Sequence, residues 1–532
     1  MKKIKSSLFF CCLGGWLGLN LLNVVQAQEP ILKIGVIQRF GDEVEDQIKI
    51  TSTKGDKLTL TLTEPEGKTK TLTTTQVTLE ILSQTQKQPV IEERLVLSDH
   101  ATFETAEASA KQWQARGIKT EITQPGRWQV WAKRDVYNTV LVRRWLLQNL
   151  KAQGYDRPYL ETNWRQTKPI VSFLLNGTRY NLHEFSITSQ KNLIRVQQTE
   201  DGEELPLRLY GGNLLLQPNA YGDFTLVNNV PLETYLRGVV PYEIGPSAPA
   251  TAMQAQTIIA RTYALRNLRR FTADNYELCA TVHCQVYKGL GNDNPKADQA
   301  ITLTKGLVLT YQNELVDALY SSTTGGITAS FTDIWNGETR PYLQPVIDSP
   351  SSTAWNLAQK SLAEEINFRN FIALQQGFNE TKTSRVFRWR KQSKLADLTK
   401  DLQKYLAKQN HPLANLTRID SMTITKRSDS GRVLEMAIAT DVGEIKLHKT
   451  EVRSAFTPPI STLFYLEPLY DNQQKLIGYT FVGGGYGHGV GLSQYGSYNL
   501  AGLGWSAEKI LEFYYPGTQV QPLNEKVVFY PK

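Results

Sequence analysis

The sequence of 532 residues has only four cysteines, no long apolar run after its first 25 residues, and no basic block with interleaved aromatics. The missing basic block argues against nucleic-acid binding. The missing apolar run argues against any membrane span beyond the N-terminus. The formal charge of +8, from 59 Lys and Arg against 51 Asp and Glu, suits an anionic surface without requiring one.

The N-terminus has the pattern of an export signal. Lys2, Lys3 and Lys5 precede a mostly apolar stretch, and Val25-Gln26-Ala27 offers small residues for cleavage before Gln28. We therefore expect a signal peptide at residues 1–27 and a mature protein outside the cytoplasm, in the periplasm or cell wall. A retained anchor is the alternative, disfavoured because the run is close to the lower length limit for spanning a bilayer. After signal cleavage we expect no stable membrane span.

The cysteines that remain after signal cleavage are Cys279 and Cys284. An even pair in an exported protein favours a disulfide, here closing a short loop. His283 lies between them, so zinc held by Cys279, His283 and Cys284 stays open as the alternative. A closed structural zinc site needs a fourth ligand, so we favour the disulfide and expect no cofactor.

The hydropathy pattern divides the mature chain into three regions. Residues 28–91 read as an N-terminal β segment, in which residues 58–63 alternate leucine with threonine. Residues 92–162 read as strand, helix, strand, strand, helix and a last strand, the order of a ferredoxin-like split βαβ sandwich. Residues 163–525 contain short strands, a strong helix over 250–268, a charged helical stretch over 359–410 and β structure over 421–446.

The middle region carries a family resemblance. Phe103, Glu107-Ala108 at the helix start, Gly117 and the strand Trp128-Gln129-Val130-Trp131 resemble the SPOR family. That resemblance implies binding to peptidoglycan glycan stripped of its stem peptides. An ordinary α+β insert is the alternative, because the split βαβ fold hosts many unrelated functions.

Four segments in the last region carry the chemistry. They are residues 230–264, with VPLETYLRGVVPYE and MQAQTIIARTYA; residues 284–289, CQVYKG; residues 321–328, SSTTGGIT, followed by Trp335; and residues 483–496, GGGYGHGVGLSQYG. Together they resemble the SpoIID/LytB family in the family's order. The resemblance implies an α+β fold in which a β-rich catalytic core carries helices, preceded by the small SPOR-like sandwich.

Glu243 is the candidate catalytic residue. It follows a strand and Pro241 at a loop that leads into the helix near Ala250, and it matches the catalytic Glu of the family. Glycosidic cleavage needs a proton for the leaving oxygen, which a carboxyl held protonated near neutral pH supplies. A solvated surface Glu, or a salt-bridge partner of Arg261, is the alternative for Glu243.

The reaction class depends on the number of carboxylates. Hydrolysis normally needs two, whereas a lytic transglycosylase uses one: the muramic 6-hydroxyl attacks its own anomeric carbon and leaves a 1,6-anhydro end. The resemblance implies lytic transglycosylation of peptide-stripped strands. Asp333, Glu233 and Asp348 stay open as second carboxylates.

The Gly-rich loop lets backbone approach a sugar chain closely, although it also suits a tight structural turn. We expect substrate-binding or Glu243-orienting side chains there and in the neighbouring segments. They are Arg261, Tyr263, Gln285, Ser321, Ser322, Thr324, His488, Ser493, Gln494 and Tyr495.

The expected partners are peptidoglycan glycan strands, with a cell-wall amidase as a further one. Two other functions stay open. The LytB branch implies an enhancer of a partner amidase, active only when that amidase is present. The remaining alternative is a non-catalytic peptidoglycan-binding wall protein.

Overall fold

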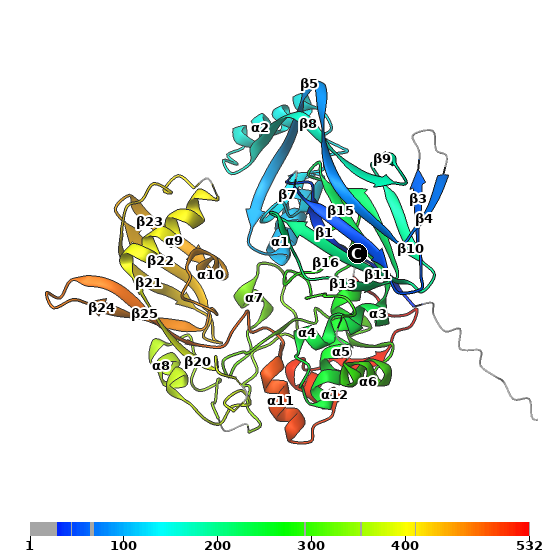
Figure 1. Cartoon of the computed structure of the whole chain (residues 1–532). Helices are drawn as coiled ribbons and strands as arrows, with labels where there is room; N and C mark the ends of the chain where they lie inside the picture. Colours follow the sequence, from blue (N-terminus) through cyan, green and yellow to red (C-terminus); the bar gives the residue numbers. More distant parts are fainter. Residues whose placement is uncertain are drawn as a thin grey trace, which may run out of the picture.

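The computed structural model describes residues 29–43, 45–63, 69–291, 294–351, 354–382, 384–409 and 411–530. The signal peptide expected at residues 1–27 lies outside this part. The protein is of the α+β class and rich in strand, as expected (Figure 1). Within the described residues, no helix is long and apolar enough to cross a membrane.

Two large sheets interleave the N-terminal strands with strands of the last region. The first has the order β16 (Leu278–Cys279), β1 (Ile31–Phe40), β15 (Phe224–Pro231), β14 (Asn213–Pro218), β10 (Phe185–Ser189), β3 (Leu58–Thr63) and β4 (Thr69–Thr74). The second has the order β12 (Glu203–Glu204), β11 (Leu193–Glu200), β2 (Gln47–Ser52), β5 (Gln76–His100), β7 (Trp128–Ala132) and β6 (Thr120–Thr123). Also in the second sheet, β8 (Tyr159–Leu175) pairs with β5 and β9 (Thr178–Leu182), and β13 (Arg208–Gly211) pairs with β11.

The local patterns explain several strands directly. In β3, every second residue of the sequence is a leucine, and these leucines share one face of the strand. Leu58, Leu60 and Leu62 are all buried, at 2% exposure or less. In β7, all five residues are buried, because one face meets helix α1 and the other meets Tyr221 through Trp131.

Residues 92–162 contain the expected order of elements, with helices α1 (Phe103–Ala115) and α2 (Val140–Ala152). Strands β8, β5, β7 and β6 lie side by side in that order, and every neighbouring pair is antiparallel. However, β5 and β8 run past residues 92 and 162 into the neighbouring regions, so the sheet is continuous across both expected boundaries. The resemblance of this unit to SPOR domains, and its binding of glycan, stay predictions.

A helical layer centres on α5 (Ala250–Arg266), in which 14 of the 17 residues are buried. A helix buried on all sides forms the centre of a core rather than its cover. Around α5 lie α3 (Leu232–Arg237), α4 (Val240–Glu243), α6 (Pro295–Leu303), α11 (Gln494–Gly502) and α12 (Ala507–Tyr514) (Figure 1). A small sheet of β18 (Glu314–Leu315), β17 (Leu307–Tyr311) and β27 (Gln519–Pro522) packs against α5 and α12.

A second lobe, yellow to orange in Figure 1, has a hydrophobic core of its own. It contains α8 (Glu365–Ala373), β20 (Arg388–Lys394), α9 (Leu395–Ala407), β21 (Ile419–Arg427), β22 (Val433–Thr440), β23 (Gly443–His448), α10 (Glu451–Ala455), β24 (Phe464–Tyr470) and β25 (Leu476–Gly484). The expected helical stretch over 359–410 is therefore right for α8 and α9 but wrong for residues 388–394. That segment pairs with β25, because Gly483 lets the Trp389 ring pack over the strand beside it.

Candidate active-site cleft

A cleft of about 380 Å³ opens where the unit of residues 92–162, the end of α4 and the Gly-rich loop meet. Strands β19 (Tyr320–Ser321) and β26 (Leu492–Ser493) pair in parallel at its base and hold the two loops together. Residues of the cleft wall include Thr102, Phe103, Glu104, Trp128, Glu243, Tyr263, Arg270, His283, Cys284, Val286, Tyr320, Ser321, Ser322, Trp335, Tyr486, His488 and Gln494.

Glu243 is the last residue of α4 and faces this cleft, half-buried. Its Oε1 accepts a hydrogen bond of 2.6 Å from the backbone N–H of Val286, and the carboxyl also bonds the Tyr320 side chain. Burial raises the pKa of Glu243, and the two hydrogen bonds oppose this rise without cancelling it. A carboxyl with a raised pKa holds its proton closer to neutral pH, as a general acid must.

Gln285 supports Glu243 from behind. Its side-chain amide donates to the Tyr320 hydroxyl at 3.1 Å, and its carbonyl oxygen accepts from the Tyr235 hydroxyl at 3.3 Å. Gln285 is fully buried and lies behind the residues that line the cleft. It therefore orients Tyr320, and through it Glu243, rather than touching a ligand.

The Gly-rich loop holds the other side of Glu243. The Gln494 side-chain amide donates to the backbone carbonyl of Glu243 at 3.0 Å. His488 accepts from the backbone N–H of Val490 at 3.0 Å through Nδ1, and it also bonds the backbone of Tyr320. Burial and two nearby arginines lower the pKa of His488 to about 3, so this imidazole is neutral. The loop needs glycine at Gly485, which has φ +78° and would place a Cβ 2.8 Å from the backbone of Thr324.

The structure brings Tyr263, Ser321, Ser322, His488 and Gln494 into the cleft together with Glu243. It places the other expected substrate-binding residues elsewhere. Arg261 is fully buried and forms a bidentate ion pair with Glu233 at 2.7 and 2.9 Å. Tyr495 is 37% exposed and packs against Tyr498.

Thr324 and Ser493 bind a buried carboxylate instead of a ligand. Their hydroxyls donate to Oε1 of Glu380, at 2.9 and 2.6 Å. Glu380 is fully buried and also accepts from the backbone N–H of Gly325 at 2.8 Å. This carboxylate therefore joins the 321–328 segment to the Gly-rich loop, which gives both hydroxyls a structural role.

The three open second carboxylates lie outside the described cleft wall. Glu233 is paired with Arg261, Asp333 accepts from the Ser430 hydroxyl at 2.6 Å, and Asp348 is fully buried under the Tyr514 hydroxyl. Within the part of the wall that the structure describes, the carboxylate other than Glu243 is Glu104, which the sequence did not single out.

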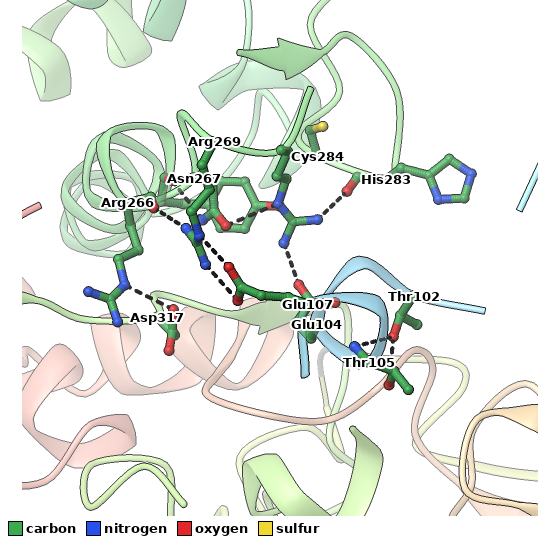
Figure 2. A network of polar contacts seen from close by, with 12 residues as sticks. Thr102, Glu104, Thr105, Glu107, Arg266, Asn267, Arg269, His283, Cys284 and Asp317 are labelled. Carbon is green, nitrogen blue, oxygen red and sulfur yellow. Dashed lines mark hydrogen bonds and ion pairs between the residues drawn. The ribbon is translucent and has the colours of Figure 1, made fainter. Parts of the chain in front are cut away.

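The start of α1 brings the unit of residues 92–162 to the cleft, which sequence reasoning missed (Figure 2). Glu104 pairs with Arg270, and Glu107 pairs with Arg269 at 2.5 Å, so two carboxylates of α1 face two arginines that follow α5. Behind them, the Trp128 ring lies 5.1 Å from both the Phe103 and the Phe271 rings. Residues 92–162 thus pack against the segment that follows α5 and form one wall of the cleft.

Comparison with known proteins identifies the region around Glu243. Residues 220–311 match the family model described as stage II sporulation protein, and this stretch holds Glu243 and all of α5. This stretch is therefore a domain of the SpoIID family. A second match, to a domain of unknown function, covers residues 329–491, which include β20–β25 of the second lobe.

Three relatives share sequence with larger parts of this chain. It is 26% identical over 381 residues to an uncharacterized protein of Brachyspira hyodysenteriae, covering 69% of this chain and 88% of that one. It is 29% identical over 300 residues to the amidase enhancer of Bacillus subtilis, covering 53% of this chain but 40% of the enhancer. It is 25% identical over 312 residues to stage II sporulation protein D of Bacillus subtilis, covering 55% and 75%.

Within the stretch that matches the SpoIID family model, Cys279 and Cys284 form the disulfide that the sequence favoured. The bonded sulfurs are not thiolates, so the zinc alternative loses two of its three local ligands. His283 carries an exposed ring that points away from the cysteine in Figure 2. Among the described residues, no group of three or more His, Cys, Asp or Glu side chains gathers as metal ligands would.

Proposed function

We propose that the protein cleaves the glycan strands of peptidoglycan by lytic transglycosylation, with Glu243 as its single acid and base. One observation carries this proposal: Glu243 has a raised pKa and faces a cleft whose other described carboxylate, Glu104, is paired with Arg270. Membership of a family that includes stage II sporulation protein D supports peptidoglycan as the polymer.

In the proposed reaction, Glu243 first gives its proton to the glycosidic oxygen as the bond from that oxygen to the muramic anomeric carbon breaks. The 6-hydroxyl oxygen of the same sugar then bonds to the anomeric carbon, and its proton returns to Glu243. The carboxyl ends the cycle protonated and no water is consumed, so one carboxyl suffices where hydrolysis uses two. The neutral Nε2–H tautomer of His488 and the Gln285 amide hold Tyr320, which keeps Glu243 in place.

The finer features of the substrate and the location are part of the proposal. Residues of α1 line the same cleft as Glu243, and the resemblance of residues 92–162 to SPOR domains supports a peptide-stripped strand as substrate. The proposed location is outside the cytoplasm, where this polymer lies. The export signal expected at residues 1–27 supports that location.

The test is a digest of purified glycan strands, with and without stem peptides, followed by mass spectrometry. We expect new 1,6-anhydro-muramic ends with the wild type and none with Glu243→Gln. Glu444→Gln, at an exposed position of β23, is the matched control and should cleave like the wild type. Cleavage by Glu243→Gln at the wild-type rate would refute Glu243 as the acid.

A second candidate function follows from the relative named amidase enhancer. Under that function, the protein raises the activity of a cell-wall amidase and cuts no glycan alone. Adding a purified amidase to the same digest separates the two: faster release of stem peptides that is unaffected by Glu243→Gln would favour the enhancer.

A further inference from the structure

Two residues of the cleft wall each carry a buried hydrogen-bond donor that has no partner among the described residues. These donors are the hydroxyl of Ser321 and the indole N–H of Trp335. Both side chains are more than nine-tenths buried, with exposed fractions of 6% and 5%. Buried donors are almost always paired, so two unpaired ones in a single cleft indicate a place where a ligand completes the bonding.

Both donors are fixed in position before any ligand binds. Trp335 follows α7 (Phe331–Ile334), its backbone N–H bonds the Phe331 carbonyl at 3.0 Å, and its ring packs against the rings of Phe331 and His488. Ser321 lies in β19, paired with Ser493 of β26. Because neither side chain has to be ordered on binding, the entropy lost when a ligand binds them is small.

A chain of contacts links these donors to the proposed acid. The Trp335 ring lies 5.0 Å from the ring of His488, and His488 bonds the backbone of Tyr320. Tyr320 precedes Ser321 and bonds Glu243 through its hydroxyl. A group bound by Ser321 and Trp335 therefore lies in the same cleft as Glu243, on the wall that positions it.

The chemistry of the wall selects the ligand group. Two neutral donors set among the rings of Trp335, Tyr320 and Tyr486 suit a neutral acceptor with an apolar end. A carboxylate would need a free cation, and Arg270, the one Lys or Arg of the described wall, is already paired with Glu104. The acetamido group, with a carbonyl oxygen and a methyl, is a neutral acceptor with an apolar end, and both sugars of peptidoglycan carry one.

We propose that Ser321 and Trp335 bind the acetamido carbonyl of a glycan sugar and so make the cleft selective for N-acetylated strands. This inference rests on the proposed function for the identity of the polymer, but it concerns recognition and not the reaction. It makes Trp335 a specificity-determining residue, and it gives Ser321 a defined ligand.

The test measures binding in the Glu243→Gln background, so that no turnover disturbs the measurement. The probes are peptide-free glycan strands that are N-acetylated, chemically de-N-acetylated, or re-acetylated after that treatment. We expect the N-acetylated and re-acetylated strands to bind more tightly than the de-N-acetylated ones. Trp335→Phe and Ser321→Ala should each weaken binding of the acetylated strands by roughly three- to tenfold, the usual worth of one neutral hydrogen bond. The preference should fall by the same factor.

Trp389→Phe is the matched control. Trp389 is also buried, but its indole N–H already donates to the Gly485 carbonyl at 2.9 Å, and it lies outside the cleft. Trp389→Phe should lower the melting temperature and leave the N-acetyl preference unchanged. Trp335→Phe should leave the melting temperature unchanged and lower the N-acetyl preference, because it removes a donor that makes no bond within the fold.

The outcomes distinguish this inference from the proposed function. Variants that keep the wild-type preference, or strands that do not bind at all, overturn the inference. A preference that falls as expected, in a protein whose native Glu243 form cuts no strand, sustains the inference and refutes the transglycosylase alone.

Discussion

The Tyr320 hydroxyl donates a hydrogen bond to the carboxyl of Glu243, and Tyr320 is in turn held by the Gln285 amide and by His488. Val286 and Tyr320, from two separate segments of the chain, thus act together on the protonation of Glu243. Burial raises the pKa of Glu243 while this hydrogen bond and the one from Val286 lower it. The operating pH of the protein follows from that balance.

Tyr320→Phe should move the pH profile of cleavage. The substitution removes a hydrogen bond that lowers the pKa of Glu243, so that pKa rises further. A general acid is lost as pH rises through its pKa, so the alkaline limb of the rate profile should shift to higher pH. Tyr287→Phe removes a buried hydroxyl that donates to Asn228 at 2.8 Å, outside the cleft, and should leave the limb in place. An unshifted limb in Tyr320→Phe would contradict this coupling.

Acid should destabilise the fold through His488. Its pKa falls from 6.5 to about 3 on folding, so the unfolded chain binds a proton at a pH where the folded chain does not. This contribution to stability is complete above pH 6.5 and is lost as pH falls toward 3. Urea unfolding at a series of pH values should show a shallower acid loss for His488→Asn than for the wild type. The exposed His448 provides the control substitution, and equal slopes for His488→Asn and the wild type would refute the assignment.

The Arg261–Glu233 pair should matter for stability and not for binding. The Arg261 side chain is fully buried and that of Glu233 is 16% exposed, so Glu233→Ala leaves a buried cation without its partner. Breaking such a pair costs about 3–5 kcal/mol of unfolding free energy. Asp420→Ala is the comparison, because Asp420 pairs with Arg418 and their side chains are 44% and 70% exposed, respectively. This change should cost less than about 1 kcal/mol of unfolding free energy. Denaturant titration measures both. If the Glu233→Gln variant is folded and binds glycan but cannot cleave it, Glu233 is a second carboxylate of the reaction and its role is not only structural.

The sequence predicted those helices and strands in which the order of apolar and polar residues agrees with which residues are buried. The Leu-Thr alternation of β3 and the apolar surface of α5 are examples. Strand β20 was missed because RWRKQSK has no alternation of its own, and its pairing with β25 decides its conformation. Which strands pair in a sheet depends on residues far apart in the sequence, and the β propensity of a single segment does not reveal it.

The residues of the candidate site were also predicted only in part. The motif around Glu243 and the Gly-rich loop predicted three residues that the structure brings into one cleft: Glu243, His488 and Gln494. Ser493 and Thr324 could not be separated from cleft residues, since nothing in the sequence shows that Glu380 lies beneath them. Glu104 and Trp128 reach the cleft only because the unit of residues 92–162 packs against Arg269 and Arg270.

The interleaved sheets make a prediction about truncation. A fragment of residues 163–532 lacks β1 and β3, which pair with β15 and β10, so both partner strands lose a neighbour. We expect this fragment to show no cooperative thermal transition by circular dichroism, whereas residues 29–532 should unfold in one. A cooperative transition in the fragment would show that residues 163–525 fold as a domain of their own.

The central claim is that Glu243 acts alone and that no water enters the product. The most direct measurement is a digest of peptide-stripped strands in heavy-oxygen water, with mass spectrometry of the new ends. The proposed reaction predicts ends that are lighter by one water than reducing ends and that carry no heavy oxygen. Heavy oxygen at new reducing ends would mean hydrolysis, and a second carboxylate would then have to activate that water.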